Sequence, residues 1–555
     1  MSEIRKNDIF TVKINEINNL GCGVGKTDDG IVVFVAGAVT GDSVEVKAIK
    51  VNKTYIVARL EKIIEPSAFR IPVAFCNASN SCGGCVYRHV TYEHELQMKR
   101  AYVESAFKKV GLSSVNVLPV ISNGKTSGYR NKAQYPVRQS KRGIEAGFYA
   151  AKSHNIVPVD DCSLQPDIFG RILRFICKYA ERNAISVYDE TTGKGLLRHI
   201  YLRIAQGTGE IMVCLVINGD ALPQTSKFVG ELTERFEKIS SVMLNINKKN
   251  TNVVLGDKYI CIGGKSYIED ILCSKRFEIS AGSFYQVNHD MAQVLYRLAA
   301  DLAVGAEKNE KPKTLLDLYC GTGTIGLSMA DRAEKIIGIE IVEEAVECAK
   351  RNAAKNGIEN AEFYCADASD AKKLLDRAER ENGEILADVA IIDPPRKGST
   401  RELIEYLSER QIDRVVYVSC DCNTLARDCV MFAELGYSIG DVQPVDLFPR
   451  TGHVETIVLL GRKDIHERIK FDVNVEDLHG RASATATYPE IKAYVLEKFG
   501  LKVSSLYIAQ IKEKCGLDKR ENFNIGEGKS RPLICPPEKE QAIMDAFRHF
   551  GMIDT

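Results

Sequence analysis

The pattern of apolar and polar positions changes along the chain and predicts several kinds of structure. Near the start, apolar and polar residues alternate over Asp8 to Ile17, Ile31 to Val35 and Asp42 to Ile49, which is typical of half-buried strands. Glycines between these stretches supply turns. We therefore predict an OB-like β-barrel over residues 1–65, a scaffold that often binds RNA.

From about residue 280, short apolar runs alternate with helical stretches. Such runs are typical of strands that are buried on both faces of a parallel sheet. The six runs are 314–319, 336–340, 361–365, 388–393, 414–420 and 454–460. This alternation predicts an α/β domain with a doubly wound, Rossmann-like parallel sheet over residues 280–462.

The remaining segments carry weaker patterns. Residues 66–279 are expected to form a central α+β domain, with a helix near 91–110 that packs on the 280–462 domain. After Gly461 the sheet pattern stops, and 463–555 is expected to be a helical appendage. Thr487-Tyr488-Pro489-Glu490 fits a capping box that opens a helix to about Phe499. Two more helices are expected over 503–515 and 536–549.

Composition narrows the class of protein only slightly. The 555 residues are 45% hydrophobic and 27% charged, as in ordinary globular proteins, and the formal net charge is zero. Nucleic-acid binding must therefore come from local patches. No apolar stretch reaches transmembrane length, and the start lacks a signal-peptide core, so we expect a cytoplasmic protein with no membrane partner.

One local patch combines cations with aromatic rings, the combination that binds single-stranded RNA. Residues 121–155 contain one acid, Glu145, and these basic and aromatic residues: Lys125, Arg130, Lys132, Arg138, Lys141, Arg142, Lys152, Tyr129, Tyr135, Phe148 and Tyr149. A solvated strand surface over core aromatics is an equally good interpretation. The tail is also locally basic, at Lys512, Lys514, Lys519 and Arg520, which suits an RNA contact, a protein contact or a stabilising cap.

The chain has 17 cysteines. In a cytoplasmic protein, cysteines indicate metal binding or catalysis rather than disulfides. Cys76, Cys82 and Cys85 lie close together in sequence, and Cys162 follows later. Four thiolates of this kind can hold zinc or an iron–sulfur cluster.

Residues 315–326 contain a strand, a glycine turn and a helix start, the arrangement of a cofactor-binding motif. Gly321, Gly323 and Gly326 let the backbone approach a ligand, and they also match a dinucleotide fingerprint, which leaves NAD open. Glu340 ends the next apolar run, where a carboxylate can accept hydrogen bonds from ribose hydroxyls. Asp367 follows the third run and suits either the adenine edge or a helix N-cap.

Two later motifs favour methyl transfer over hydride transfer. Asp393-Pro394-Pro395 ends the fourth run in a loop that proline holds rigid. Methyltransferases that act on nucleobases commonly carry such an acidic Pro-Pro loop, and NAD dehydrogenases do not need it. Cys420 ends the fifth run, where ligands bind in open α/β sheets, and is a candidate nucleophile. Cys422 is a second thiol two residues away.

Together these motifs resemble the RNA (uracil-5-)-methyltransferase family, of the TrmA and RumA type. The resemblance rests on Leu-Asp-Leu-Tyr-Cys-Gly-Thr-Gly-Thr, Asp-Pro-Pro-Arg-Lys-Gly, Tyr-Val-Ser-Cys-Asp-Cys-Asn-Thr-Leu-Ala-Arg-Asp and His-Val-Glu-Thr. The first 65 residues are similar to a TRAM domain, the RNA-binding module of the RumA branch. The resemblance covers residues 1 to about 462.

The resemblance implies a reaction and a set of roles. S-adenosylmethionine is expected to be the methyl donor, and carbon 5 of a uridine in RNA the acceptor. Cys420 matches the family nucleophile, which adds to uracil carbon 6, and Glu455 matches the general base. Asp393 matches a residue near both substrate and cofactor. Gln286, Tyr319 and Glu340 match cofactor-binding positions. The family commonly has proline where this chain has Cys422.

The cysteine set resembles the 4Fe-4S site of the RumA branch, with Cys76, Cys82, Cys85 and Cys162 as ligands. Zinc remains the alternative. By analogy we expect 23S rRNA as the substrate and a monomeric enzyme. The alternatives are a tRNA uracil-5-methyltransferase, a non-catalytic RNA-binding assembly factor and an NAD oxidoreductase with a metal domain.

Overall fold

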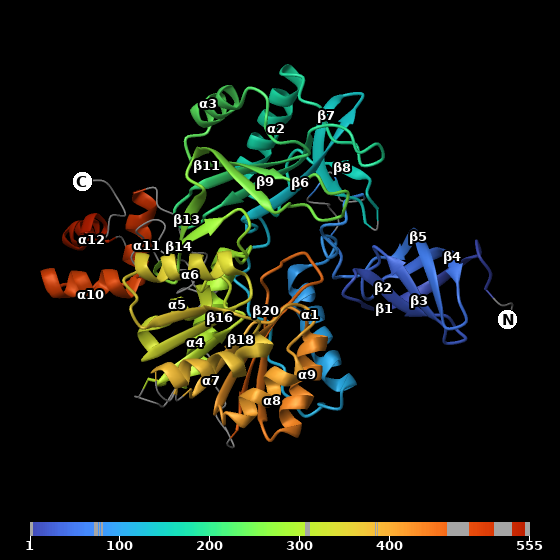
Figure 1. Cartoon of the computed structure of the whole chain (residues 1–555). Coiled ribbons are helices and arrows are strands. Elements are labelled where there is room, and N and C mark those ends of the chain that lie inside the picture. Colours follow the sequence, from blue (N-terminus) through green and yellow to red (C-terminus); the bar gives the residue numbers. More distant parts are fainter. Residues whose placement is uncertain are drawn as a thin grey trace. The chain divides into compact units, whose positions relative to one another are not determined.

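The computed structural model describes residues 4–71, 76, 78, 81–151, 153–305, 311–382, 385, 387–462, 488–515 and 535–549. The chain divides into two compact units, Met1–Asn474 and Val475–Thr555. The first unit holds a barrel and two seven-stranded sheets (Figure 1). None of the helices in the described ranges is both long and apolar enough to span a bilayer.

The predicted barrel is confirmed, and it has five strands. Its strands close in the order β1-β2-β3-β5-β4, so the barrel leaves no edge strand unpaired. Alternate residues such as Val12, Ile14, Val33 and Val35 are buried inside it, which is why this segment alternates in sequence. The strands are β1 (Ile9–Ile17), β2 (Cys22–Lys26), β3 (Val32–Ala36), β4 (Ser43–Val51) and β5 (Tyr55–Glu65).

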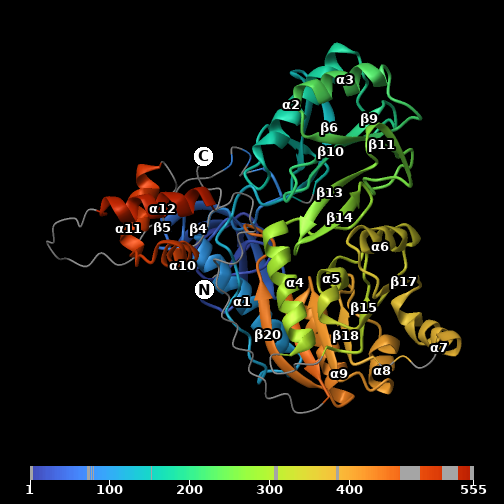
Figure 2. The same ribbon diagram turned by 90° about the vertical axis from the view of Figure 1, so that its left-hand side faces the viewer.

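The central sheet has the order β12-β11-β10-β9-β6-β7-β8, and helices α2 and α3 share its core. The hairpin β13–β14 lies between this sheet and the next one (Figures 1 and 2). The elements are β6 (Lys132–Ser140), β7 (Gly143–Tyr149), β8 (Ile156–Pro158), α2 (Asp167–Arg182), β9 (Leu197–Ile204), β10 (Ile211–Ile217), α3 (Thr225–Arg235), β11 (Ile239–Ile246), β12 (Lys258–Gly264), β13 (Tyr267–Leu272) and β14 (Lys275–Ser280).

Two aromatic residues of the predicted RNA patch belong to the interior instead. Tyr129 and Tyr135 are fully buried, and the Tyr129 hydroxyl donates to the Pro449 carbonyl at 2.9 Å. Rings packed in a core cannot stack on bases, so the core interpretation is correct for these two. Phe148 and Tyr149 are partly exposed, and Lys152 lies outside the described residues.

The second large sheet has the order β17-β16-β15-β18-β19-β21-β20. Its strands lie between α4 on one side and α1, α8 and α9 on the other (Figure 1), and α1 packs on α9 and β20. The elements are α1 (Tyr92–Lys109), α4 (His289–Val304), β15 (Thr314–Leu318), α5 (Thr324–Ser328), η1 (Ala330–Arg332), β16 (Lys335–Glu340), α6 (Glu343–Lys355), β17 (Ala361–Cys365), η2 (Ala368–Asp370), α7 (Ala371–Asn382), β18 (Val389–Ile392), α8 (Arg401–Glu409), β19 (Arg414–Ser419), α9 (Cys422–Glu434), β20 (Ser438–Val445) and β21 (Glu455–Gly461).

The predicted parallel order holds for β15 to β19, but the last predicted strand differs. β21 runs antiparallel to both β19 and β20. β20 escaped prediction because Gly440, Asp441 and Pro444 interrupt its apolar pattern, and its register shifts between Ile439 and Val442.

A buried ion network fixes the loop between β20 and β21. Lys99 of α1 donates to Glu95 Oε1 and to Asp446 Oδ1, both at 2.8 Å, and to the Phe448 carbonyl at 3.1 Å. The Arg450 backbone N–H donates to Glu95 at 2.7 Å. The side chains of Lys99, Glu95 and Asp446 are at most 2% exposed, so each depends on the others for its polar partners.

In the described part of the second unit the expected helices are present: α10 (Tyr488–Phe499), α11 (Ser505–Lys514) and α12 (Pro537–His549). Its core includes Ile491, Val495, Ile508, Ile543 and Phe547. Thr487 of the predicted capping box, Lys519 and Arg520 lie outside the described residues.

Candidate active site

Three strand ends of the β15–β21 sheet converge on one site. Asp393 follows β18 and Cys420 follows β19, so both lie at the carboxyl edge, where ligands bind in such sheets. Glu455 begins β21. Because β21 is antiparallel to β19, Ser419 pairs with Thr456, and the first residues of β21 reach the same edge. The three predicted catalytic residues are therefore together.

The surroundings of the Glu455 and Asp393 carboxyl groups favour their protonated forms near neutral pH. Glu455 is 3% exposed, and burial together with repulsion from Asp393 raises its pKa to about 8. Burial and repulsion from Asp317 raise the pKa of Asp393 to about 7. Groups with such values can both donate and accept protons at physiological pH.

The Cys420 thiol faces a cavity of about 200 Å³, which Arg396, His453 and Val454 also line. Burial, together with repulsion from Glu455 and Asp393, raises the pKa of Cys420 to about 11, and the Arg396 guanidinium acts in the opposite direction. Arg396 is thus the positive group that favours the thiolate.

Cys422 has different surroundings although it lines the same cavity. It is 1% exposed at the start of α9. Burial and then Asp421 raise its pKa to about 12, whereas the Tyr102 hydroxyl acts in the opposite direction. Glu455 and Asp393 are among the groups that raise the pKa of Cys420, so Cys420 is the thiol with two carboxyl groups as acid–base neighbours.

The glycine turn after β15 leaves room for a cofactor. Gly321 has φ +56°, and a Cβ added there would meet no atom within 4 Å, so its backbone faces open space. Its N–H donates to Glu340 Oε2 at 3.0 Å, while Glu340 Oε1 accepts from the Val342 N–H at 2.9 Å. Glu340 therefore braces the turn, and each oxygen keeps a lone pair for a ribose hydroxyl.

The other predicted cofactor residues flank this turn. Gly323 has φ +77° and is the N-cap of α5, while Tyr319 takes a left-handed φ of 66° directly after β15. Asp367 caps η2 and accepts from the Ser369 N–H and hydroxyl, at 2.9 and 2.7 Å. The N-cap interpretation of Asp367 is thus correct, and its adenine contact stays a prediction.

Gln286 is buried between β14 and α4, where its carbonyl accepts from Asn131 Nδ2 at 2.9 Å. The next-but-one residue, Asn288, caps α4 by accepting from the Met291 N–H. Gln286 is therefore held in a fixed loop that comes from outside the β15–β21 sheet.

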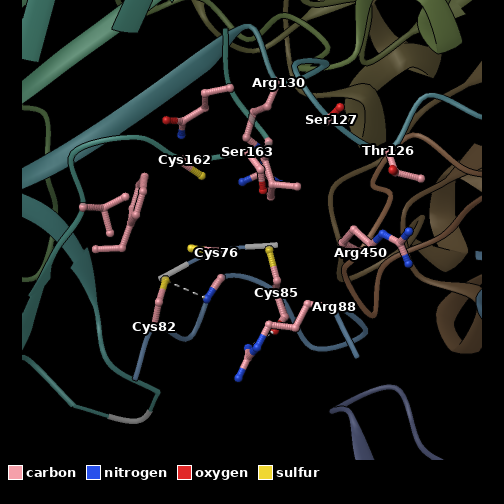
Figure 3. A pocket seen from close by; sticks show the side chains of 15 residues that line it. Cys76, Cys82, Cys85, Arg88, Thr126, Ser127, Arg130, Cys162, Ser163 and Arg450 are labelled. Atoms are coloured by element: carbon pink, nitrogen blue, oxygen red, sulfur yellow. Dashed lines mark hydrogen bonds between the residues drawn. The ribbon is translucent and has the colours of Figure 1, made fainter. Parts of the chain in front are cut away.

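A second cavity, of about 190 Å³, contains all four predicted metal ligands. Cys76, Cys82, Cys85 and Cys162 line it, and their sulfurs face a common space (Figure 3). Burial and the nearby Cys162 and Cys82 raise the pKa of Cys85 to about 12; Arg130 and Arg88 act in the opposite direction. The thiols are thus close enough to influence one another, and cations are at hand to balance thiolate charge. Within the described ranges, no three His, Cys, Asp or Glu residues are arranged to hold a single metal ion.

Comparison with known proteins agrees with this site. A family model described as tRNA (Uracil-5-)-methyltransferase matches residues 91–463, and a TRAM domain model matches residues 5–60. A curated relative from Clostridium acetobutylicum, named an uncharacterized RNA methyltransferase, is 41% identical over 83% of this chain and 98% of its own length. The chain belongs to the RNA uracil-5-methyltransferase family. It is therefore an S-adenosylmethionine-dependent RNA methyltransferase, as predicted.

Further relatives give the same result. A protein from Bacillus cereus, named an uncharacterized RNA methyltransferase, is 39% identical over 83% of this chain and 98% of its own length. A crystal structure of the Pyrococcus abyssi tRNA (uracil-54, C5)-methyltransferase with S-adenosyl-L-homocysteine has a TM-score of 0.64 and 28% identity. That match covers 81% of this chain and 99% of the other. The helical unit lies beyond residue 463, where the family match ends.

Three residues of this methyltransferase site escaped the sequence analysis. Asn19 of the barrel and Tyr102 of α1 line the Cys420 cavity, although they lie hundreds of residues from Cys420 in sequence. No local pattern marks them. Asp317 had a usable signal, because it is a carboxylate inside an apolar run. It is 1% exposed, accepts from the Gly326 N–H at 2.8 Å, and burial raises its pKa to about 7.

Proposed function

We propose that this enzyme methylates carbon 5 of a uridine in RNA through a covalent bond between Cys420 and uracil carbon 6. The observation that carries the proposal is the position of Cys420, flanked by Glu455, Asp393 and Arg396 on the wall of a base-sized cavity. This set supplies the nucleophile, the base and the charge stabilisation that the reaction requires.

The first step is thiolate addition. Cys420 Sγ bonds to carbon 6, and the ring electrons move toward carbon 5 and the carbonyl oxygen at carbon 4. Asp393 is protonated in part near pH 7, so its carboxyl group can donate a hydrogen bond to that oxygen. Arg396 favours the thiolate before attack. S-adenosylmethionine supplies the methyl group as part of a sulfonium, from which carbon 5 displaces it.

Glu455 completes the reaction. Its carboxylate takes the proton from carbon 5, the double bond between carbons 5 and 6 re-forms, and the bond to Cys420 Sγ breaks. A raised pKa makes Glu455 a stronger base than an exposed carboxylate. The turn of Gly321 and Gly323 would hold the donor, and Glu340 would accept hydrogen bonds from its ribose hydroxyls. Gln286, Tyr319 and Asp367 are the further contacts that we propose.

We propose a 4Fe-4S cluster in the cavity of Cys76, Cys82, Cys85 and Cys162. A single zinc ion needs thiolates about 2.3 Å from one point, whereas a cluster accepts wider spacing. The four cysteine sulfurs line one cavity, and cysteine thiolates are the ligands that such a cluster uses, which supports the proposal. Arg88 and Arg130 would offset its negative charge.

For the substrate we propose 23S rRNA, by analogy with enzymes that combine a TRAM domain with a cysteine cluster. In this division of labour, residues 1–65 and 66–279 bind RNA, residues 280–462 catalyse, and residues 463–555 are accessory. A tRNA substrate is the second candidate, since the Pyrococcus abyssi relative of known structure is a tRNA enzyme.

The test is transfer of tritiated methyl from S-adenosylmethionine to unmodified 23S rRNA and, separately, to unmodified tRNA. Product digestion should yield 5-methyluridine from the ribosomal RNA. Label in the transfer RNA alone would establish the second candidate, and no label in either RNA would refute the proposed activity.

A further inference from the structure

The cavity beside Cys420 has a wall that comes from the barrel. The turn between β1 and β2 contacts the loop before β21 so closely that a Cβ on Gly452 would lie 1.8 Å from the Asn19 carbonyl oxygen. The Tyr87 hydroxyl donates to the Asn18 carbonyl at 3.0 Å. A Cβ on Gly21 would lie 2.7 Å from the Val86 carbonyl oxygen. Because Gly21 and Gly452 have no Cβ, the β1–β2 turn can pack closely against the segments that it contacts beside the cavity.

The Tyr102 hydroxyl ties the barrel to the catalytic loop. It accepts from Asn19 Nδ2 at 3.1 Å and from Asn423 Nδ2 at 2.8 Å. A hydroxyl has two lone pairs and one proton, so these two donors use both of its lone pairs. Tyr102 is thus a junction of three elements: the barrel turn, α1 and the start of α9.

This junction fixes the direction of the Asn19 amide, which lines the cavity together with Cys420. Donation to Tyr102 uses one N–H of that amide, and an amide also carries a second N–H and a carbonyl oxygen. The uracil edge presents two carbonyl oxygens and one N–H, to which an amide is complementary. A barrel that bound RNA only at a distance from the Cys420 cavity would not need a polar side chain at position 19.

We propose that the β1–β2 turn of the barrel forms part of the uridine pocket and that Asn19 is a substrate-positioning residue, whose amide hydrogen-bonds the uracil held beside Cys420. The inference rests on the proposed function. It gives the barrel a role in the methyl-transfer step itself, in addition to any affinity that it provides for RNA.

The test measures two quantities on the full-length enzyme: the dissociation constant for RNA and the single-turnover rate of methyl transfer at saturating RNA. Asn19→Ala should lower the rate about tenfold, the loss of one or two hydrogen bonds, and change the dissociation constant less than about twofold. The matched control is Asn52→Ala, the same change in the β4–β5 turn of the barrel, which should leave both quantities as in the wild type.

Tyr102→Phe provides a second variant, because it keeps the ring and removes the hydroxyl. It should reproduce most of the loss. Asn19→Ala combined with Tyr102→Phe should be no slower than about the slower single variant, since both disrupt one junction.

Equal rates for Asn19→Ala and Asn52→Ala, or a loss of Asn19→Ala that appears only in the dissociation constant, would overturn the inference. A wild-type enzyme that transfers no methyl group to any RNA would instead refute the proposed function, and this inference with it.

Discussion

Two cavities in the described part of the first unit are lined by cysteines, yet their surroundings differ. Around Cys420 the neighbours are carboxyl groups, Glu455 and Asp393, with one guanidinium, Arg396. Around Cys85 the neighbours are other thiols, with Arg88 and Arg130. A thiol beside a base can exchange protons and return to its starting state, whereas thiols that face one another favour permanent ligation of a shared cation centre. The groups that surround a thiol, rather than the thiol itself, therefore indicate the chemistry that its cavity suits.

The largest expected effect comes from the nucleophile. Cys420→Ser should lower methyl transfer at least about 10³-fold, because the hydroxyl is a far weaker nucleophile. It should also abolish the covalent adduct with 5-fluorouracil RNA, which wild-type enzyme forms and which resists denaturing electrophoresis. RNA and cofactor should still bind.

Cys422→Ser is the matched control, since it makes the same atomic change in the same cavity. It should retain both adduct formation and methyl transfer. If Cys422→Ser loses the adduct while Cys420→Ser keeps it, the assignment of the nucleophile is wrong.

Glu455→Gln should separate methyl transfer from product release. Without the base, the carbon 5 proton remains, and methylated RNA stays attached to Cys420. Turnover should fall about 10²- to 10⁴-fold, while tritium from the methyl donor accumulates on protein. Wild-type turnover in this variant would remove Glu455 from the mechanism.

The cavity of Cys76, Cys82, Cys85 and Cys162 should respond differently to a cysteine-to-serine substitution. Anaerobically purified wild-type protein should be brown and hold about four iron and four sulfide per chain. Cys85→Ser should lose most of both and unfold at a lower temperature, whereas Cys420→Ser should keep them. Colourless wild-type protein with one zinc would refute the cluster.

The smallest expected effect is on the pH dependence of stability. Glu455 keeps its proton up to about pH 8 when folded, but releases it near pH 4.5 when unfolded. Between these values the folded state binds more protons, so the free energy of unfolding should fall as pH rises. The slope from this group is about 1 kcal/mol per pH unit. Denaturation of Glu455→Gln across this range should show a flatter profile; identical slopes would contradict the burial argument.

Local patterns predicted the elements better than their directions. The runs of β15, β16, β18 and β19 are apolar because both faces of those strands are covered, and such a run is visible in sequence. The direction of β21 depends on its pairing with β19 and β20, which no residue of β21 encodes. That direction is what brings Glu455 to Cys420.

The candidate site shows the same difference between residues marked by a local pattern and residues placed by long-range packing. Cys420, Glu455 and Asp393 stand in recognisable motifs at strand ends, so the sequence could single them out as candidates. Asn19 and Tyr102 reach the cavity only because separately folded layers dock on one another, a contact that depends on the packing of whole surfaces. Likewise, the burial of Tyr129 and Tyr135 reflects neighbouring layers rather than the local sequence pattern.

The salt-bridged lysine at position 99 has a consequence for the nucleic acid. Its ammonium group holds Asp446 and Phe448, just ahead of the stretch that supplies Gly452 and His453 to the pocket. Movement of that stretch would leave buried charged groups without their partners, at a cost of about 3–5 kcal/mol. That stretch should therefore keep its position when RNA binds, and we expect an acceptor base to leave its stack in order to reach the cavity.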